Sequence, residues 1–198
     1  YEIGLGISAE PLFRSSYYIV GWLILDQVDE AVAQKDNTFF LKHDATGKRN
    51  GNGAIFLDSD ISLTTRPYTV ILYGHNMKSG NMFGRLRKYK ESAYFNSHRI
   101  ITFDTLYEEG QYAVFSVMEM DTTPGTVRWY DLWSLVTDRI PDREEAIRNL
   151  EQLYFSQFLI ADSFSSTNLA SLCSFVIVII FLLSGCEVLL LMKPPDTQ

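Results

Sequence analysis

One histidine, His75, stands where a strand should end and a polar loop should begin. The residues before it form an apolar, β-favouring run at 70–73, and Gly74 then permits a sharp exit of the backbone. The residues that follow are rich in asparagine, serine and glycine, which favours a loop. An imidazole can donate or accept a proton near neutral pH, so a histidine presented at a strand end is a candidate catalytic residue. The alternative is an ordinary solvated loop histidine.

Other groupings of chemically active residues are weaker. His43 and Asp44 could form a dyad, but neighbours on an extended segment point to opposite sides, so we expect a structural role for His43. His98 directly precedes a predicted strand, and we expect a surface residue there. A zinc site built from Cys173, Cys186 and two histidines would lack any short-spaced pair of ligands, so we expect no metal.

The sequence around His75 is distinctive over a longer range. Tyr73-Gly74-His75-Asn76-Met77 is followed by Met82-Phe83-Gly84, with strand-like pieces before it at 20–23, 40–44 and 53–58 and after it at 100–103 and 112–117. In this order, residues 17–121 closely resemble the class B sortases. The resemblance implies a cysteine transpeptidase that joins surface proteins to the cell wall or to each other, with His75 as its catalytic histidine.

The elements that would position these residues are mostly strands. Apolar and β-branched runs predict strands at 54–57, 70–73, 100–103 and 112–118. Apolar residues recur at helical spacing within residues 131–158, after a good helix start at Pro141-Asp142. The resemblance implies a mainly β fold with added helices, a sortase-like closed β-barrel with one long helix between two late strands.

Length and composition fit one globular domain over residues 1–198. A chain of 198 residues can bury a sizeable core, and 46% hydrophobic residues exclude a disordered protein. A net charge of −7 argues against a nucleic-acid partner, because neutralising phosphates needs a basic face. Class B sortases carry an amino-terminal membrane anchor. The resemblance therefore predicts an ectodomain that follows such an anchor, at the extracellular face of the cell membrane.

The carboxy-terminal region contains an uncharged stretch between Asp162 and Glu187. Valine and isoleucine dominate the apolar run at 175–183, which suits a strand buried on both faces. The uncharged stretch also approaches the length of about 20 residues that crosses a bilayer. We expect a pair of buried strands, with a membrane or interfacial segment as the alternative.

The same region should hold the nucleophile. In sortases the cysteine ends the penultimate strand in a Thr-Leu-x-Thr-Cys type motif. Both Ser171-Leu172-Cys173 and Leu183-Ser184-Gly185-Cys186 keep parts of that motif. We favour Cys173, because a connecting loop and a last strand must still follow, and 25 residues follow Cys173 against 12 after Cys186. Cys186 is the alternative nucleophile.

The arginine that begins the last strand in sortases has no clear counterpart. The alignment places it near Cys186 or Glu187, yet no arginine occurs after Arg148. In the family it holds the peptide backbone and stabilises the oxyanion, and loss of one such donor costs about 10²–10³ in rate. Lys193 is the only later cation and lacks the planar fork of a guanidinium. Two functions therefore stay open: a transpeptidase, and a sortase-fold protein with little or no turnover that binds sorting peptides or is structural.

The resemblance also implies the reaction partners. The substrate would be a sorting motif of the Asn-Pro-x-Thr-Asn or Leu-Pro-x-Thr-Gly kind, cleaved after the threonine. The acceptor would be a cell-wall cross-bridge amine or a pilin lysine, and no cofactor is expected. Trp129, Tyr130 and Trp133 could line a peptide groove or simply pack in the core.

Overall fold

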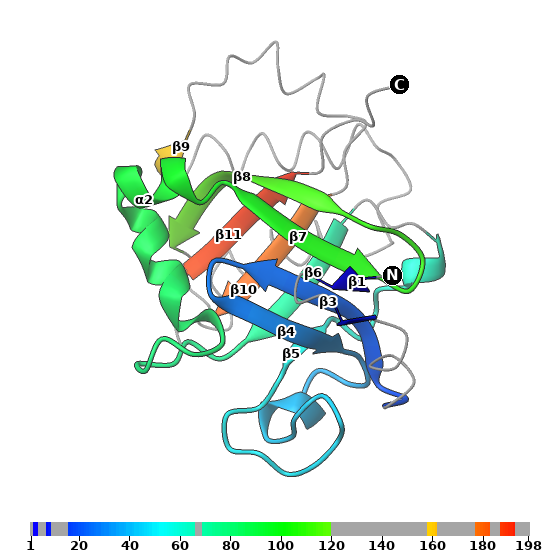
Figure 1. Ribbon diagram of the computed structural model, residues 1–198. Coiled ribbons are helices and arrows are strands. Elements are labelled where there is room, and N and C mark those ends of the chain that lie inside the picture. Colours follow the sequence, from blue (N-terminus) through cyan, green and yellow to red (C-terminus); the bar gives the residue numbers. More distant parts are fainter. Residues whose placement is uncertain are drawn as a thin grey trace.

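A curled sheet of mainly antiparallel strands, with short helices at its edge, makes up the fold (Figure 1). The computed structural model describes residues 2–3, 7–8, 16–65, 69–119, 158–161, 177–182 and 187–192. Within these ranges, no helix is long and apolar enough to cross a membrane.

The described strands run in chain order as β1 (Glu2–Ile3), β2 (Ile7–Ser8), β3 (Ile19–Leu25), β4 (Val28–Ala33), β5 (Ile55–Leu57), β6 (Thr69–Gly74), β7 (Ile100–Thr105), β8 (Gln111–Glu119), β9 (Phe158–Ala161), β10 (Ile177–Leu182) and β11 (Glu187–Met192). The helical segments are η1 (Phe39–Leu41), η2 (Leu63–Thr65), η3 (Phe83–Lys90) and α2 (Ser92–Ser97). The strands expected at 54–57, 70–73, 100–103 and 112–118 correspond to β5, β6, β7 and β8, so these predictions are confirmed.

One sheet unites nine strands of the described part of the chain, in the order β11-β10-β6-β5-β4-β3-β7-β8-β9. β11 also pairs with β8, and this extra pairing closes the sheet on itself. β1 and β2 form a separate two-stranded sheet. The expected sortase-like closed barrel is confirmed.

The apolar run of the carboxy-terminal region forms a strand. β10 lies between β6, to which it is parallel, and β11, to which it is antiparallel. Its backbone therefore has strand partners along both edges. The expected strand pair is confirmed as β10 and β11.

The predicted long helix at 131–158 lies outside the described residues, except at its last position. Phe158 begins β9 and pairs with Met118 of β8, so the predicted helix end is wrong at this residue. The prediction failed here because residues 158–160 form a short apolar run, and the periodicity of so short a run does not distinguish a strand from a helix.

A buried carboxylate ties β5 to β6. Asp58 directly follows β5 and has no exposed surface. Its Oδ2 accepts hydrogen bonds from the Tyr73 hydroxyl at 2.6 Å and from Asn37 Nδ2 at 3.1 Å. Its Oδ1 accepts one from the backbone N–H of Asp60 at 2.9 Å. A buried charge needs such partners, so this cluster fixes the relative positions of two strands and the turn before η1.

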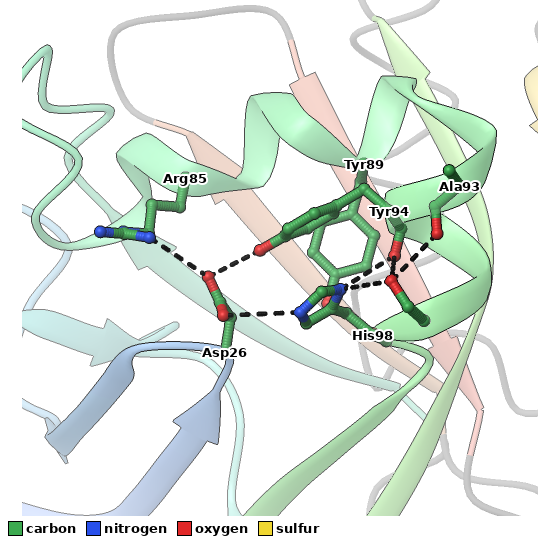
Figure 2. A network of polar contacts seen from close by, with 7 residues as sticks. Asp26, Arg85, Tyr89, Ala93, Tyr94 and His98 are labelled. Atoms are coloured by element: carbon green, nitrogen blue, oxygen red, sulfur yellow. Dashed lines mark hydrogen bonds and ion pairs between the residues drawn. The ribbon is translucent and has the colours of Figure 1, made fainter.

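A second polar network holds the helical segments against the β3–β4 turn (Figure 2). Asp26 Oδ2 accepts a 2.6 Å hydrogen bond from the Tyr94 hydroxyl and lies 3.8 Å from the Arg85 guanidinium. His98 stacks on the Tyr94 ring with its Nε2 3.7 Å from Asp26 Oδ1. We expected His98 to be a surface residue, but it is half-buried and contacts both Tyr94 and Asp26. Because η3 follows the loop after β6, this network anchors the far end of that loop.

We predict that Asp58→Ala lowers the free energy of unfolding by about 2–4 kcal/mol, because it removes the buried acceptor of the Tyr73 and Asn37 donors. Urea unfolding followed by circular dichroism measures the loss. Asp60→Ala is the matched control, because Asp60 is an exposed carboxylate two residues away and should change stability by less than about 0.5 kcal/mol. Equal losses in the two variants would contradict the role given to Asp58.

Candidate functional site

Strand β6 delivers His75, which is the first residue after Gly74. A Cβ at Gly74 would lie 2.6 Å from the ring of Phe83, so this strand end requires a glycine. The backbone N–H of Phe83 donates to the carbonyl oxygen of His75 at 3.1 Å, and Asn76 pairs with Met82 across the loop. The chain therefore leaves β6, turns over residues 76–82 and returns to His75 before η3 begins.

The imidazole of His75 is half-buried and held by the backbone of η1. Its Nε2 lies 3.0 Å from the carbonyl oxygen of Leu41. Two residues earlier in the chain, the Tyr73 hydroxyl donates a hydrogen bond to Asp58. Burial, and then the hydrogen bond to Asp58, raise the pKa of Tyr73, so this hydroxyl stays protonated at physiological pH.

β10 ends beside the strand end that carries His75. The two strands are parallel and aligned from Ile177 opposite Thr69 to Leu182 opposite Gly74. Their carboxyl ends therefore coincide, as expected where a histidine and a nucleophile come from neighbouring strands. Cys173 and Cys186, the two predicted nucleophiles, lie outside the described residues, respectively four residues before and four residues after β10.

With Cys173 as the nucleophile, the resemblance predicted an arginine near Cys186 or Glu187, and Cys186 lies outside the described residues. β11 begins at Glu187, which pairs with Glu119 of β8. Lys193 and the aromatic residues Trp129, Tyr130 and Trp133 lie outside the described residues.

His43 has the structural role that its position predicted. Its ring stacks on that of Phe39 with a centroid distance of 4.0 Å, and its Nδ1 lies 2.7 Å from the Phe39 carbonyl oxygen. It therefore braces the η1 segment that holds His75.

Sequence reasoning missed both the residue that holds His75 and the buried carboxylate that ties β5 to β6. Leu41 acts through its backbone carbonyl, which is the same in every residue type, so no side-chain pattern could reveal it. Asp58 gave one usable signal, because a carboxylate directly after three buried strand residues is rarely left without partners.

No protein-family model matches this chain. The sortase B of Listeria monocytogenes serovar 1/2a is 34% identical over 107 residues, covering 52% of this chain and 44% of that protein. The sortase B of Staphylococcus aureus is 32% identical over 122 residues, covering 60% of this chain and 50% of that protein. A crystal structure of a Bacillus anthracis protein similar to sortase B has a TM-score of 0.78 and 29% identity, over 93% of this chain and 81% of that one. The chain is similar in sequence and in fold to the class B sortases.

The chain spans about half the length of the curated sortase B relatives that it matches. The structural match covers more of the chain than either sequence match does. The resemblance on which the sequence interpretation depended is confirmed.

We predict that Gly74→Ala lowers the free energy of unfolding by about 1–3 kcal/mol, because the new methyl group overlaps the fully buried Phe83 ring. Phe83→Leu should recover part of that loss when the two changes are combined, since it removes the overlapping atoms. Urea unfolding of the two single variants and the double variant measures this coupling. Strictly additive losses would show that Gly74 and Phe83 do not constrain each other.

Proposed function

We propose that this sortase-like chain is a cysteine transpeptidase that cleaves a sorting peptide after threonine and transfers the acyl group to an amine. The main support for the proposal is that two neighbouring parallel strands, β6 and β10, end at the same level. His75 follows β6, and a segment that contains a cysteine follows β10. Relatedness to the class B sortases supports the reaction class.

The partners are proposed by the same relationship. The fold resembles that of the Staphylococcus aureus sortase B–substrate complex at a TM-score of 0.72 and 22% identity, and that of a sortase B complexed with triglycine at 0.73 and 22%. These relatives support a sorting-motif peptide as substrate and a cell-wall cross-bridge amine as acceptor, with a pilin lysine as the alternative. We place the protein at the extracellular face of the cell membrane, behind an amino-terminal anchor like that of the family.

The strand register favours Cys186 as the nucleophile, although spacing alone had favoured Cys173. Val188 lies opposite Phe181, so Glu187 comes at the level of Leu182 and hence of Gly74. Cys186 directly precedes Glu187, and adjacent Cα atoms are about 3.8 Å apart. With neighbouring strands about 4.8 Å apart, the Cα of Cys186 lies within about 14 Å of the end of β6. Cysteine and histidine side chains that point toward each other can bridge most of this distance.

Cys173 is connected to the opposite end of β10. The strand rises by about 3.3 Å per residue, so the level of Ile177 is about 20 Å from the level of His75. The four residues from Ile177 back to Cys173 span about 14 Å at most, even when fully extended. Cys173 could approach His75 only if the chain before β10 ran straight back along the strand. This geometry supports Cys186.

The proposed chemistry uses only groups that the chain carries. The Cys186 thiolate attacks the threonine carbonyl carbon, and the Sγ–C bond forms as the peptide C–N bond breaks. The imidazolium of His75 gives its proton to the leaving amine nitrogen. The acceptor amine then attacks the thioester, returns a proton to His75 and releases Cys186 as the thiolate.

The rival function is a sortase-fold protein that binds sorting peptides without turnover or is structural. The sequence favours this rival, because no arginine follows Arg148 to take the role that an arginine has in the family. The two functions differ in one observable, a covalent bond between the peptide and the protein.

We predict that incubation with a fluorescence-quenched sorting-motif peptide yields a thioacyl adduct on Cys186, detected by mass spectrometry. Cys186→Ser and His75→Ala should abolish the adduct, whereas Cys173→Ser should retain it. His98→Ala is the matched histidine control and should also retain it, because His98 contacts Tyr94 and Asp26 rather than η1. An adduct on Cys173 would reverse the assignment of the nucleophile, and peptide binding with no adduct on either cysteine would establish the rival function.

We further predict that Glu187→Arg raises kcat by about 10²-fold or more and leaves peptide affinity nearly unchanged, because it supplies the missing oxyanion donor. Glu187→Gln is the control, since it removes the negative charge without adding a guanidinium. Steady-state cleavage of the same peptide measures both variants. An equal gain in both would mean that charge repulsion, rather than a missing donor, limits the rate.

A further inference from the structure

The hydrogen bond between the His75 ring and η1 determines which ring nitrogen carries hydrogen. A backbone carbonyl oxygen can only accept, so the 3.0 Å contact with Leu41 requires a hydrogen on Nε2. Within the part of the chain that the structure describes, Nδ1 has no hydrogen-bond partner. The neutral ring is therefore the Nε2–H tautomer, and Nδ1 is the nitrogen that can gain and lose a proton.

The Leu41 carbonyl is held rigidly on both sides along the chain. The carbonyl of Phe40 accepts from Ala54 N at 3.0 Å, and that of Lys42 accepts from Asn50 N at 2.8 Å. These two bonds fix the peptide groups that flank Leu41, so the Leu41 carbonyl is directed at His75 by backbone geometry alone.

Asp36 fixes the start of the same segment. Its Oδ1 accepts hydrogen bonds from the backbone N–H groups of Thr38 at 2.9 Å and Phe39 at 2.8 Å. Hydrogen bonds, first that from the Thr38 hydroxyl, lower the pKa of Asp36, so the carboxylate remains ionised at neutral pH. Phe40, which follows in η1, is fully buried and anchors the segment in the core.

Gly53 provides the space for the edge of the ring that makes this hydrogen bond. It has a φ of +66°, and a Cβ there would lie 2.5 Å from the Phe40 carbonyl oxygen and 3.0 Å from Cδ2 of His75. Cδ2 is bonded directly to Nε2. A side chain at position 53 would therefore displace both the η1 backbone and the imidazole.

We propose that the Leu41 carbonyl and Gly53 form a positioning cradle that holds His75 as the Nε2–H tautomer and assigns the catalytic proton to Nδ1. This rests on the proposed transpeptidase function. In the acylation step the Nδ1–H bond of the imidazolium breaks and the proton moves to the leaving amine nitrogen, while Nε2–H stays bonded to Leu41. In the second step the attacking amine returns a proton to Nδ1. Leu41 and Gly53 are positioning residues, because they act only through His75.

The direct test is nitrogen-15 NMR of the full chain labelled at its three histidines, with His75→Gln identifying the His75 signals. At pH 9, where an imidazole is neutral, the proposal predicts that His75 carries its hydrogen on Nε2 and that this hydrogen exchanges slowly with water. A hydrogen on Nδ1, or an Nε2 hydrogen that exchanges as fast as in a free histidine, would overturn the proposal.

Two glycine variants test the cradle itself. Gly53→Ala should abolish the slowly exchanging Nε2 hydrogen and lower kcat by about 10²-fold with little change in KM, because the ring is displaced. Gly51→Ala is the matched control, since a Cβ at Gly51 meets nothing within 4 Å, and it should leave both readouts unchanged. Asp36→Ala, which only loosens η1, should accelerate the exchange even if Gly53→Ala does not fold.

The NMR readout needs no turnover, so it separates this proposal from the proposed function. A protected Nε2 hydrogen in a chain that forms no thioacyl adduct would refute the transpeptidase and keep the cradle. An adduct-forming chain whose Gly53→Ala variant keeps the wild-type hydrogen signal would refute the cradle and keep the transpeptidase.

Discussion

The parallel pairing of β6 with β10 is the constraint on which the site depends. It joins segments more than a hundred residues apart in the sequence, since Thr69 lies opposite Ile177. A parallel pair needs a long crossover connection, and closing that connection costs conformational entropy. The hydrogen bonds and packing that β10 forms with a strand on each edge offset this cost. β11 supplies the second side and, by pairing with β8, closes the barrel. The coincident strand ends are the product of this closure.

Around that pairing, the groups that orient His75 come from the amino-terminal half of the barrel. The Asp58 cluster fixes β5, β6 and the turn before η1, and the η1 backbone then directs the Leu41 carbonyl at the imidazole. The described side-chain and backbone contacts that hold the His75 ring therefore come from outside the carboxy-terminal strands, although β6 itself pairs with β10. A chain of this kind can retain a well-formed histidine site even where the nucleophile strand has diverged, which is consistent with the absent arginine.

The sequence predicted the parts of the fold that depend on local pattern. The strands at β5, β6, β7 and β8 followed from apolar and β-branched runs, and the family resemblance supplied the barrel that joins them. The sequence could not predict the hydrogen bond between Leu41 and His75, because every residue type carries the same backbone carbonyl. The end of the long helix failed at Phe158, where an apolar run fits either structure. Residue counting favoured Cys173 because it assumed a connecting loop between the nucleophile and the last strand, whereas only the four residues 183–186 separate β10 from β11.

The transpeptidase that we propose requires that the chain after β10, rather than the chain before it, meets His75. An experimental electron-density map of residues 160–198 tests this claim most directly. We expect the sulfur of Cys186 within about 3–5 Å of the His75 ring, allowing for the looser contacts of unliganded sites, and Cys173 at the opposite end of β10. A map that shows Cys173 beside His75, or both cysteines on the far side of the barrel, would contradict the account.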